Sequence, residues 1–313
     1  MQVMTTAALL PFSGWNRIFI DHARLHPWIA GGLALGLLTV GVLLAQSLGS
    51  IVAGDADTGL RLALLGGLAG FVTTSLGALP ALVLRGLAQR VNDTLLGFAA
   101  GMMLAACAFS LLLPGIEAGI EIAGSKALGA GAVVAGMVLG VLLMLGLDEF
   151  LPHEHESTGP CGAGAERCGR VWLFVFAMAL HNLPEGMAIG VSFSQGDMSV
   201  GLPLTTAIAI QDIPEGLAVA LAVHAAGFTP ALAVGLAILS GALEPVGALL
   251  GVGLASGLAL AYPIGLGLAG GAMLFVVSHE VIPETHRNGH QTAATIGLMA
   301  GFALMMVLDT TLG

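Results

Sequence analysis

The sequence predicts an all-α polytopic membrane protein, a bundle of helices that cross the bilayer. Of 313 residues, 57% are hydrophobic and only 9% are charged, whereas a soluble domain carries about 25% charged residues. Apolar runs recur along the chain without the alternation over about ten residues that a transmembrane barrel requires. These observations exclude a soluble domain and favour membrane-spanning helices.

Nine segments have the length and composition of membrane-spanning helices, which need about 20 predominantly apolar residues. They are 27–48, 60–84, 94–113, 128–147, 171–193, 202–223, 231–255, 262–283 and 292–312. Asp93, just before the third segment, is the expected N-terminal cap of that helix. The first segment also resembles a signal peptide, because Arg17 and Arg24 precede it. Its length and the lack of a small-residue cleavage site favour a retained helix.

The basic residues predict the orientation. With a cytoplasmic N-terminus, the outer segments contain only Arg61 and Lys126 of the nine basic residues. The positive-inside rule therefore places the N-terminus in the cytoplasm and the C-terminus outside. The segment 148–170 then becomes a long cytoplasmic loop that carries His153 and His155.

Charge and cysteine content exclude several function classes. The net charge of −10, with no basic stripe, argues against nucleic acid as a partner. No Walker A pattern occurs, and Lys126 is the only lysine, so ATP is not expected to drive transport. The spacing of Cys161 and Cys168 is not that of a zinc ribbon, and free cytoplasmic thiols are expected.

Two similar hexads lie near the middle of the fifth and sixth segments. They read His-Asn-Leu-Pro-Glu-Gly at 181–186 and Gln-Asp-Ile-Pro-Glu-Gly at 211–216. Positions i, i+3 and i+4 share one face of a helix, so the polar residues of each hexad project together. The two faces are expected to meet at the membrane midplane, where the glycines allow close approach of a neighbouring backbone. The residues concerned are His181, Asn182, Glu185, Gln211, Asp212 and Glu215.

The charge of this region points to a bound cation. Glu185, Asp212, Glu215 and Glu244 would together carry −4, and the segments between 171 and 283 contain no Lys or Arg. Protonation or bound cations must offset this charge, because charged groups inside a bilayer are costly. An imidazole combined with carboxylates suits zinc or another first-row divalent ion better than calcium or magnesium. A purely structural role as interhelical hydrogen-bond partners is the alternative.

Further metal-binding groups are expected on the cytoplasmic side. His279, Glu280 and His290 form a candidate exit route, with an ordinary solvated helix end as the alternative. His153 and His155 in the long loop could capture or sense metal, or belong to a plain solvated loop.

Two other functions would also place histidine or carboxylate side chains within the membrane. An intramembrane metalloprotease requires His-Glu-x-x-His on one helix, but Pro283 stands where the second histidine would be. An enzyme is therefore not expected. A cation or proton carrier of another family could use the same carboxylates, but His181 and Gln211 would then lack an explanation.

The two hexads and the preceding His-containing loop resemble the ZIP (Zrt/Irt-like protein) family of divalent-metal transporters, in particular its bacterial members. The resemblance implies an eight-helix ZIP core at 60–313, and the extra transmembrane helix within the N-terminal region at 1–59 departs from this eight-helix pattern. It also implies inward transport of Zn²⁺ across the bacterial inner membrane by alternating access, with Cd²⁺ or other divalent transition metals as further substrates. A homodimer is the implied assembly.

The resemblance further implies a binuclear metal centre. Carried over by motif position, one ion would be held by His181, Glu185, Gln211 and Glu215. The second would be held by Asn182, Asp212 and Glu244, with Glu185 and Glu215 bridging both ions. Met103, in the third segment, resembles an additional ligand position of the family. A methionine in a helix is also an ordinary packing residue.

Overall fold

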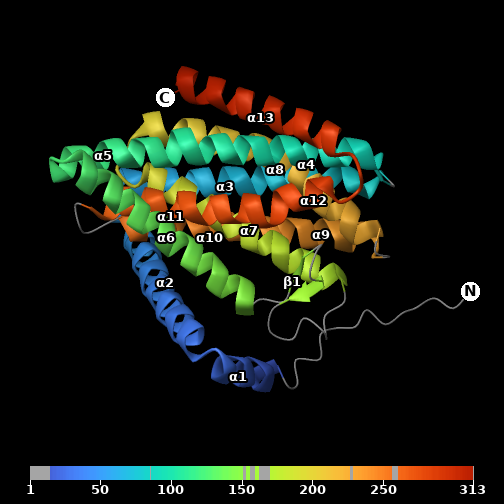
Figure 1. The fold of residues 1–313 in the computed structure, drawn as a ribbon, viewed down its shortest axis with the longest axis horizontal. Coiled ribbons are helices and arrows are strands. Elements are labelled where there is room, and N and C mark those ends of the chain that lie inside the picture. The colour runs from blue at the N-terminus through green and yellow to red at the C-terminus, as the bar shows by residue number, and fades with distance from the viewer. Residues whose placement is uncertain are drawn as a thin grey trace, which may run out of the picture.

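The computed structural model describes residues 15–84, 86–150, 153–155, 159–161, 170–225, 228–255 and 260–312, although some side chains within these ranges are not described. The chain is an all-α bundle, as the sequence predicts (Figure 1). Its elements are α1 (Trp15–Leu25), α2 (Pro27–Ala53), α3 (Thr58–Ala78), η1 (Leu79–Leu82), α4 (Gln89–Ala105), η2 (Ala106–Leu112), α5 (Leu113–Ala123), α6 (Lys126–Phe150), β1 (His153–His155), β2 (Gly159–Cys161), α7 (Arg170–Phe193), α8 (Met198–Ala225), α9 (Pro230–Gly241), α10 (Leu243–Ala255), α11 (Ala261–Val276), η4 (Val277–Val281), α12 (Ile282–His286) and α13 (Gln291–Leu312).

Within the described residues, seven helical stretches are long and apolar enough to span a membrane. They are Thr58–Leu82, Gln89–Ala123, Lys126–Phe150, Met198–His224, Pro230–Ala255, Ala261–His286 and Gln291–Leu312. The two other segments expected from the sequence coincide with α2 and α7, which are helical throughout their backbone. The polytopic membrane fold is thereby confirmed.

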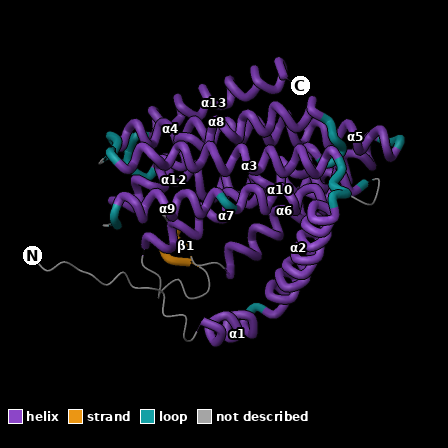
Figure 2. Tube along the Cα trace, turned by 180° about the vertical axis from the view of Figure 1, so that it is seen from behind, coloured by secondary structure: helices purple, strands orange, loops and turns teal. Residues whose placement is uncertain are grey.

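The helices pack side by side, and at the centre of the bundle α3 and α7 contact each other and each contact α8 and α10. The central group is flanked on one side by α4 and α13 (Figure 1). On the other side α2 contacts α10 and α6, then diverges from the bundle toward α1 (Figure 2). The sequence analysis did not predict α1, although Trp15, Ile18 and Phe19 have the spacing of an amphipathic helix.

Helix boundaries differ from the predictions where local side chains decide them. The third predicted helix begins at Gln89, so Asp93 lies one turn inside α4 and is not its cap. The predicted helix 231–255 is interrupted at Ala242, between α9 and α10. Pro245 explains the interruption, because it has no N–H for the carbonyl of Gly241.

The described residues of the predicted cytoplasmic loop include the end of a helix and two short strands. Its first residues extend α6 to Phe150, and β1 then pairs antiparallel with β2, with His153 opposite Cys161 and His155 opposite Gly159. β1 also contacts α7. The side chains of His153, His155 and Cys161, and the whole of Cys168, lie outside the described part of the chain.

Candidate metal centre

The two hexads lie side by side on α7 and α8, and their polar side chains are buried. Gln211 Nε2 donates a hydrogen bond of 2.5 Å to Glu185 Oε1 and so joins the two helices. His181 Nδ1 lies 3.8 Å from Glu215 Oε1, a second approach between the same helices. The predicted meeting of the two polar faces is confirmed.

Glu244 comes to this cluster from the first turn of α10 and is fully buried. The break before α10 places the carboxylate at a helix N-terminus, where backbone N–H groups and the helix dipole favour negative charge. The break therefore has a consequence for the site as well as for the fold, because it brings an acidic side chain to an electrostatically favourable position.

Two adjacent threonines of α3 donate hydrogen bonds to two of the carboxylates. Thr74 Oγ1 donates to Glu244 Oε1 at 2.8 Å, and Thr73 Oγ1 donates to Asp212 Oδ2 at 3.2 Å. The sequence analysis missed both residues. Their only signal is that they begin a run of three hydroxyl side chains, Thr73 to Ser75, in the middle of a largely apolar segment. A hydrogen-bond donor behind a ligating carboxylate orients the oxygen that faces a metal.

Glycines allow the helices to approach closely at the site. A Cβ atom added at Gly186 would overlap the carbonyl oxygen of Glu244, and one at Gly216 would overlap that of Thr74. The predicted role of the hexad glycines is thus confirmed. A Cβ at Gly70 in α3 would overlap Glu244 Oε2 itself. Only glycine at position 70 leaves room for this carboxylate.

Many polar atoms of the cluster make no hydrogen bond within the described part of the chain, although they are buried. They are His181 Nδ1, His181 Nε2, Asn182 Nδ2, Glu185 Oε2, Gln211 Oε1, Glu215 Oε2 and Glu244 Oε2. Buried polar groups are normally paired, since leaving one unpaired costs about 1–3 kcal/mol. A group of such atoms in one place therefore has the character of a ligand site.

Three carboxylates of the cluster are close enough to share a cation. Glu185, Asp212 and Glu215 each offer an oxygen, and these oxygens all lie within 4.8 Å of one another. Like charges at this separation repel strongly in a medium of low dielectric constant. A divalent cation between them would remove the repulsion and satisfy the unpaired oxygens at the same time. The residues present fit a divalent metal ion.

Met103 is buried in α4, which packs against α8. The π-helical turn η2 begins three residues later, at Ala106, and contains the buried Cys107. Such turns occur frequently at functional sites because they redirect side chains within a continuous helix. Met103 therefore lies on a helix that borders the hexads, and its role as a metal ligand stays a prediction.

A second group of metal-ligating side chains lies at the end of the bundle that is predicted to face the cytoplasm. Asp148, His279 and Glu280 each offer an atom within 4.8 Å of the other two. His279 and Glu280 lie on the π-helical turn η4, and Asp148 lies in the last turn of α6. The sequence analysis missed Asp148, which only the packing of α6 near η4 brings to this group.

His290 has a different environment. Its Nδ1 lies 2.8 Å from Asp93 Oδ2, and Asp93 Oδ1 accepts hydrogen bonds from Gln89 and Asn288. Asp93 is completely buried and thus anchors the connection between α12 and α13 to α4. The structure brings His279 and Glu280 together with Asp148 and places His290 in this other network.

Comparison with known proteins finds a matching family and several similar transporters. The ZIP Zinc transporter family matches residues 153–309, which include both hexads and Glu244. The chain is 62% identical to the zinc transporter ZIPB of Bordetella bronchiseptica, over 93% of this chain and 94% of that protein. It is 45% identical to the zinc transporter GufA of Myxococcus xanthus, over 82% and 99% of the two chains.

A more distant relative covers most of the same region. The zinc transporter ZupT of Corynebacterium glutamicum is 34% identical over 75% of this chain and 93% of its own length. Close relatives are thus matched over nearly their full length, and the family match covers the residues that form the buried cluster. The chain belongs to the ZIP family of transporters.

Proposed function

We propose that this chain transports Zn²⁺ across the bacterial inner membrane toward the cytoplasm through the buried cluster between α7, α8 and α10. The observation that carries the proposal is the convergence of four carboxylates, an imidazole and two amides, with many of their atoms buried and unpaired. The relatives named as zinc transporters support zinc as the substrate. Because the family is one of transporters, the residues act as ligands of the transported ion and not as catalysts.

The cluster has enough ligands for two ions. We assign one ion to His181, Glu185, Gln211 and Glu215, and the second to Asn182, Asp212 and Glu244, with Glu185 and Glu215 bridging both. Two divalent ions would offset the full charge of the four carboxylates. The free Oε2 atoms of Glu185, Glu215 and Glu244 support this assignment, because each carboxylate keeps one oxygen available.

The ligand types support zinc over calcium or magnesium. Zinc accepts imidazole nitrogen together with carboxylate oxygen, whereas calcium and magnesium prefer oxygen alone. Met103, if it reaches the ions, adds a soft thioether that also suits Cd²⁺. We therefore expect Cd²⁺ and some other divalent transition metals to compete with Zn²⁺.

Metal leaving the cluster has an acceptor at the cytoplasmic end. We assign this role to Asp148, His279 and Glu280, because their ligand atoms converge there. His153 and His155 lie three and five residues after the end of α6, and we propose that they capture or sense metal. His290 is the weakest member of the proposed route, since its Nδ1 is engaged by Asp93.

We propose that transport proceeds by alternating access, with a cytoplasmic N-terminus and a periplasmic C-terminus. The distribution of basic residues supports this orientation. The proposed division of the chain is an N-terminal region at 1–59 and a transport domain at 60–313. A homodimer is the proposed assembly, on the basis of the family resemblance, and chemical crosslinking of the protein in native membranes tests it.

Uptake of radioactive zinc into proteoliposomes tests the proposed function. The native chain is compared with His181→Ala and Glu215→Gln, and with Glu117→Gln as a matched control, since Glu117 is an exposed carboxylate on α5. We expect uptake to be lost in the two cluster variants and retained in the control. Native uptake that survives both cluster substitutions, in folded protein, would contradict the proposal.

A further inference from the structure

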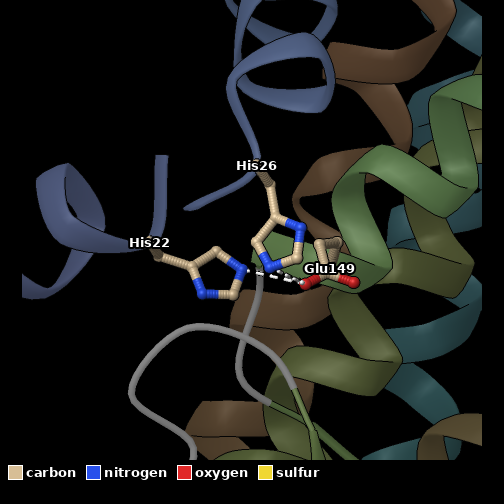
Figure 3. Close-up of side chains that lie close together, drawn as sticks. All are labelled: His22, His26 and Glu149. Carbon is tan, nitrogen blue, oxygen red and sulfur yellow. Dashed lines mark ion pairs between the residues drawn. The ribbon is translucent and has the colours of Figure 1, made fainter. Parts of the chain in front are cut away.

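A third group of metal-ligating side chains lies where the N-terminal helices meet the end of α6. Figure 3 shows the imidazole rings of His22 and His26 directed at the same carboxylate of Glu149. His22 Nε2 lies 3.0 Å from Glu149 Oε1, and His26 Nε2 lies 3.5 Å from the same oxygen. One ligand atom from each residue lies within 4.8 Å of the other two.

The backbone holds the two histidines in this arrangement. His22 lies in the last turn of α1, and His26 occupies the junction directly before α2. The N–H of His26 donates a hydrogen bond of 3.0 Å to the carbonyl of His22, so helical spacing continues through the junction. Residues at i and i+4 lie one turn apart on one face. The ring of Phe150 packs edge-on against His22 at a centroid distance of 5.1 Å and limits its rotation.

These distances match the edges of a metal coordination shell. Zinc binds imidazole nitrogen and carboxylate oxygen at about 2.1 Å, so two ligands of a tetrahedral site lie about 3.4 Å apart. The observed separations of 3.0 and 3.5 Å lie on either side of this value. His22 Nε2 is buried but makes no hydrogen bond, despite its closeness to the carboxylate. This geometry is expected when the ligand atoms point at a common metal position and not at each other.

We infer that His22, His26 and Glu149 form a further binding site for a zinc-like divalent cation, separate from the transport cluster. The three side chains are 20%, 41% and 37% exposed, so water can occupy a fourth position and the ion can exchange with the solution. Two ligands come from the α1–α2 junction and one from α6. The bound ion therefore links the N-terminal helices α1 and α2 to α6 of the bundle.

The site lies next to a member of the proposed exit group, so a bound ion would affect that group. Glu149 follows Asp148, a member of the proposed exit group, in the same last turn of α6. The predicted orientation puts the start of α2 and the end of α6 on the cytoplasmic side. The site thus responds to metal on the side where the transported ion is released, and it constrains the helix end that supplies Asp148.

Chemical labelling of histidine in the full chain tests the inference at equilibrium, without transport. Diethyl pyrocarbonate modifies accessible imidazoles, and peptide mass spectrometry measures the rate at His26 with and without Zn²⁺. We expect Zn²⁺ to slow labelling of His26 at least fivefold in the native protein. The slowing should disappear in Glu149→Gln and in His22→Gln, two variants that retain polar side chains.

Two controls separate this site from its surroundings. Asp148→Asn changes the neighbouring carboxylate, and protection of His26 should persist in that variant. His224, on α8, has its Nδ1 2.9 Å from the carbonyl oxygen of Phe228 and should label at the same rate with and without Zn²⁺. The inference would be overturned if Zn²⁺ does not change the labelling rate of His26 in the native protein. It would also be overturned if Zn²⁺ still slows labelling of His26 in Glu149→Gln. Loss of protection in Asp148→Asn would do so too, by assigning the effect to the exit group.

Discussion

Replacement of Thr74 by valine keeps the shape of the side chain and removes its hydroxyl group. In the native protein this hydroxyl donates to Glu244 Oε1 at 2.8 Å, and Glu244 Oε2 makes no hydrogen bond. One carboxylate oxygen is thus held by α3, while the other is available to a metal ion. Without Thr74, the carboxylate loses the contact that orients it and gains a second buried oxygen without a partner.

The magnitude follows from the nature of this hydrogen bond. A hydrogen bond to a charged group contributes roughly 1.5–3 kcal/mol. Substitution of such partners behind metal ligands typically lowers metal affinity about 10- to 100-fold. The free energy of the hydrogen bond and the loss of metal affinity agree with each other, because about 1.4 kcal/mol corresponds to a factor of ten in affinity. We therefore expect Thr74→Val to weaken zinc binding and to raise the KM of uptake by about 10- to 100-fold.

Thr73→Val is the matched control for this measurement. Thr73 Oγ1 also lies 3.1 and 2.9 Å from the carbonyl oxygens of Ala69 and Gly70, and its distance to Asp212 is longer, at 3.2 Å. Its hydroxyl is therefore shared, and a smaller loss is expected. Equilibrium zinc binding and zinc uptake in proteoliposomes measure both variants. Native affinity in Thr74→Val, or an equal loss in both variants, would refute the reasoning.

Three further substitutions test other parts of the structure. Gly70→Ala introduces a Cβ that overlaps Glu244 Oε2, so zinc uptake should fall at least tenfold; Gly31→Ala, which meets no atom within 4 Å, is its control. Asp93→Ala removes a buried acceptor, and the free energy of unfolding should fall by about 3 kcal/mol in thermal melts while zinc affinity is retained. Asp148→Asn should slow zinc uptake severalfold and leave equilibrium binding at the buried cluster unchanged, because the residue belongs to the proposed exit group.

Each of these expectations would be contradicted by a specific result. Equal uptake by the Gly70 and Gly31 variants would show that the Glu244 carboxylate can move without cost. An unchanged melting temperature for Asp93→Ala would show that Asp93 does not anchor the connection between α12 and α13 to α4. Native uptake rates for Asp148→Asn, measured under the same zinc gradient, would exclude this residue from the rate-limiting part of the release route.

The fold class and the core of the site could be predicted because both depend on local patterns. Apolar runs of membrane length specify helices directly, and the spacing within each hexad places its polar residues on one face. Proline followed by glutamate and glycine also predicted the close approach of a neighbouring backbone, which the structure confirms at Gly186 and Gly216. The sequence therefore predicted which residues meet, but not how each is held.

The parts that were missed depend on contacts between distant segments. Thr73 and Thr74 are ordinary helix residues until α3 packs beside α8 and α10. Asp148 becomes a member of the proposed exit group only because α6 extends beyond its apolar run and ends near η4. The break at Ala242 had a local signal in Pro245, but the prolines within α7 and α8 are accommodated without a break. Proline alone therefore could not decide where a helix ends.

The most direct test of the central claim is diffraction from crystals of the zinc-bound protein, measured on both sides of the zinc absorption edge. The account predicts anomalous density between α7, α8 and α10, within bonding distance of His181, Glu215 and Glu244. Anomalous density confined to the groups around Asp148 and Glu149, with none among the hexads in a folded and zinc-saturated protein, would contradict it.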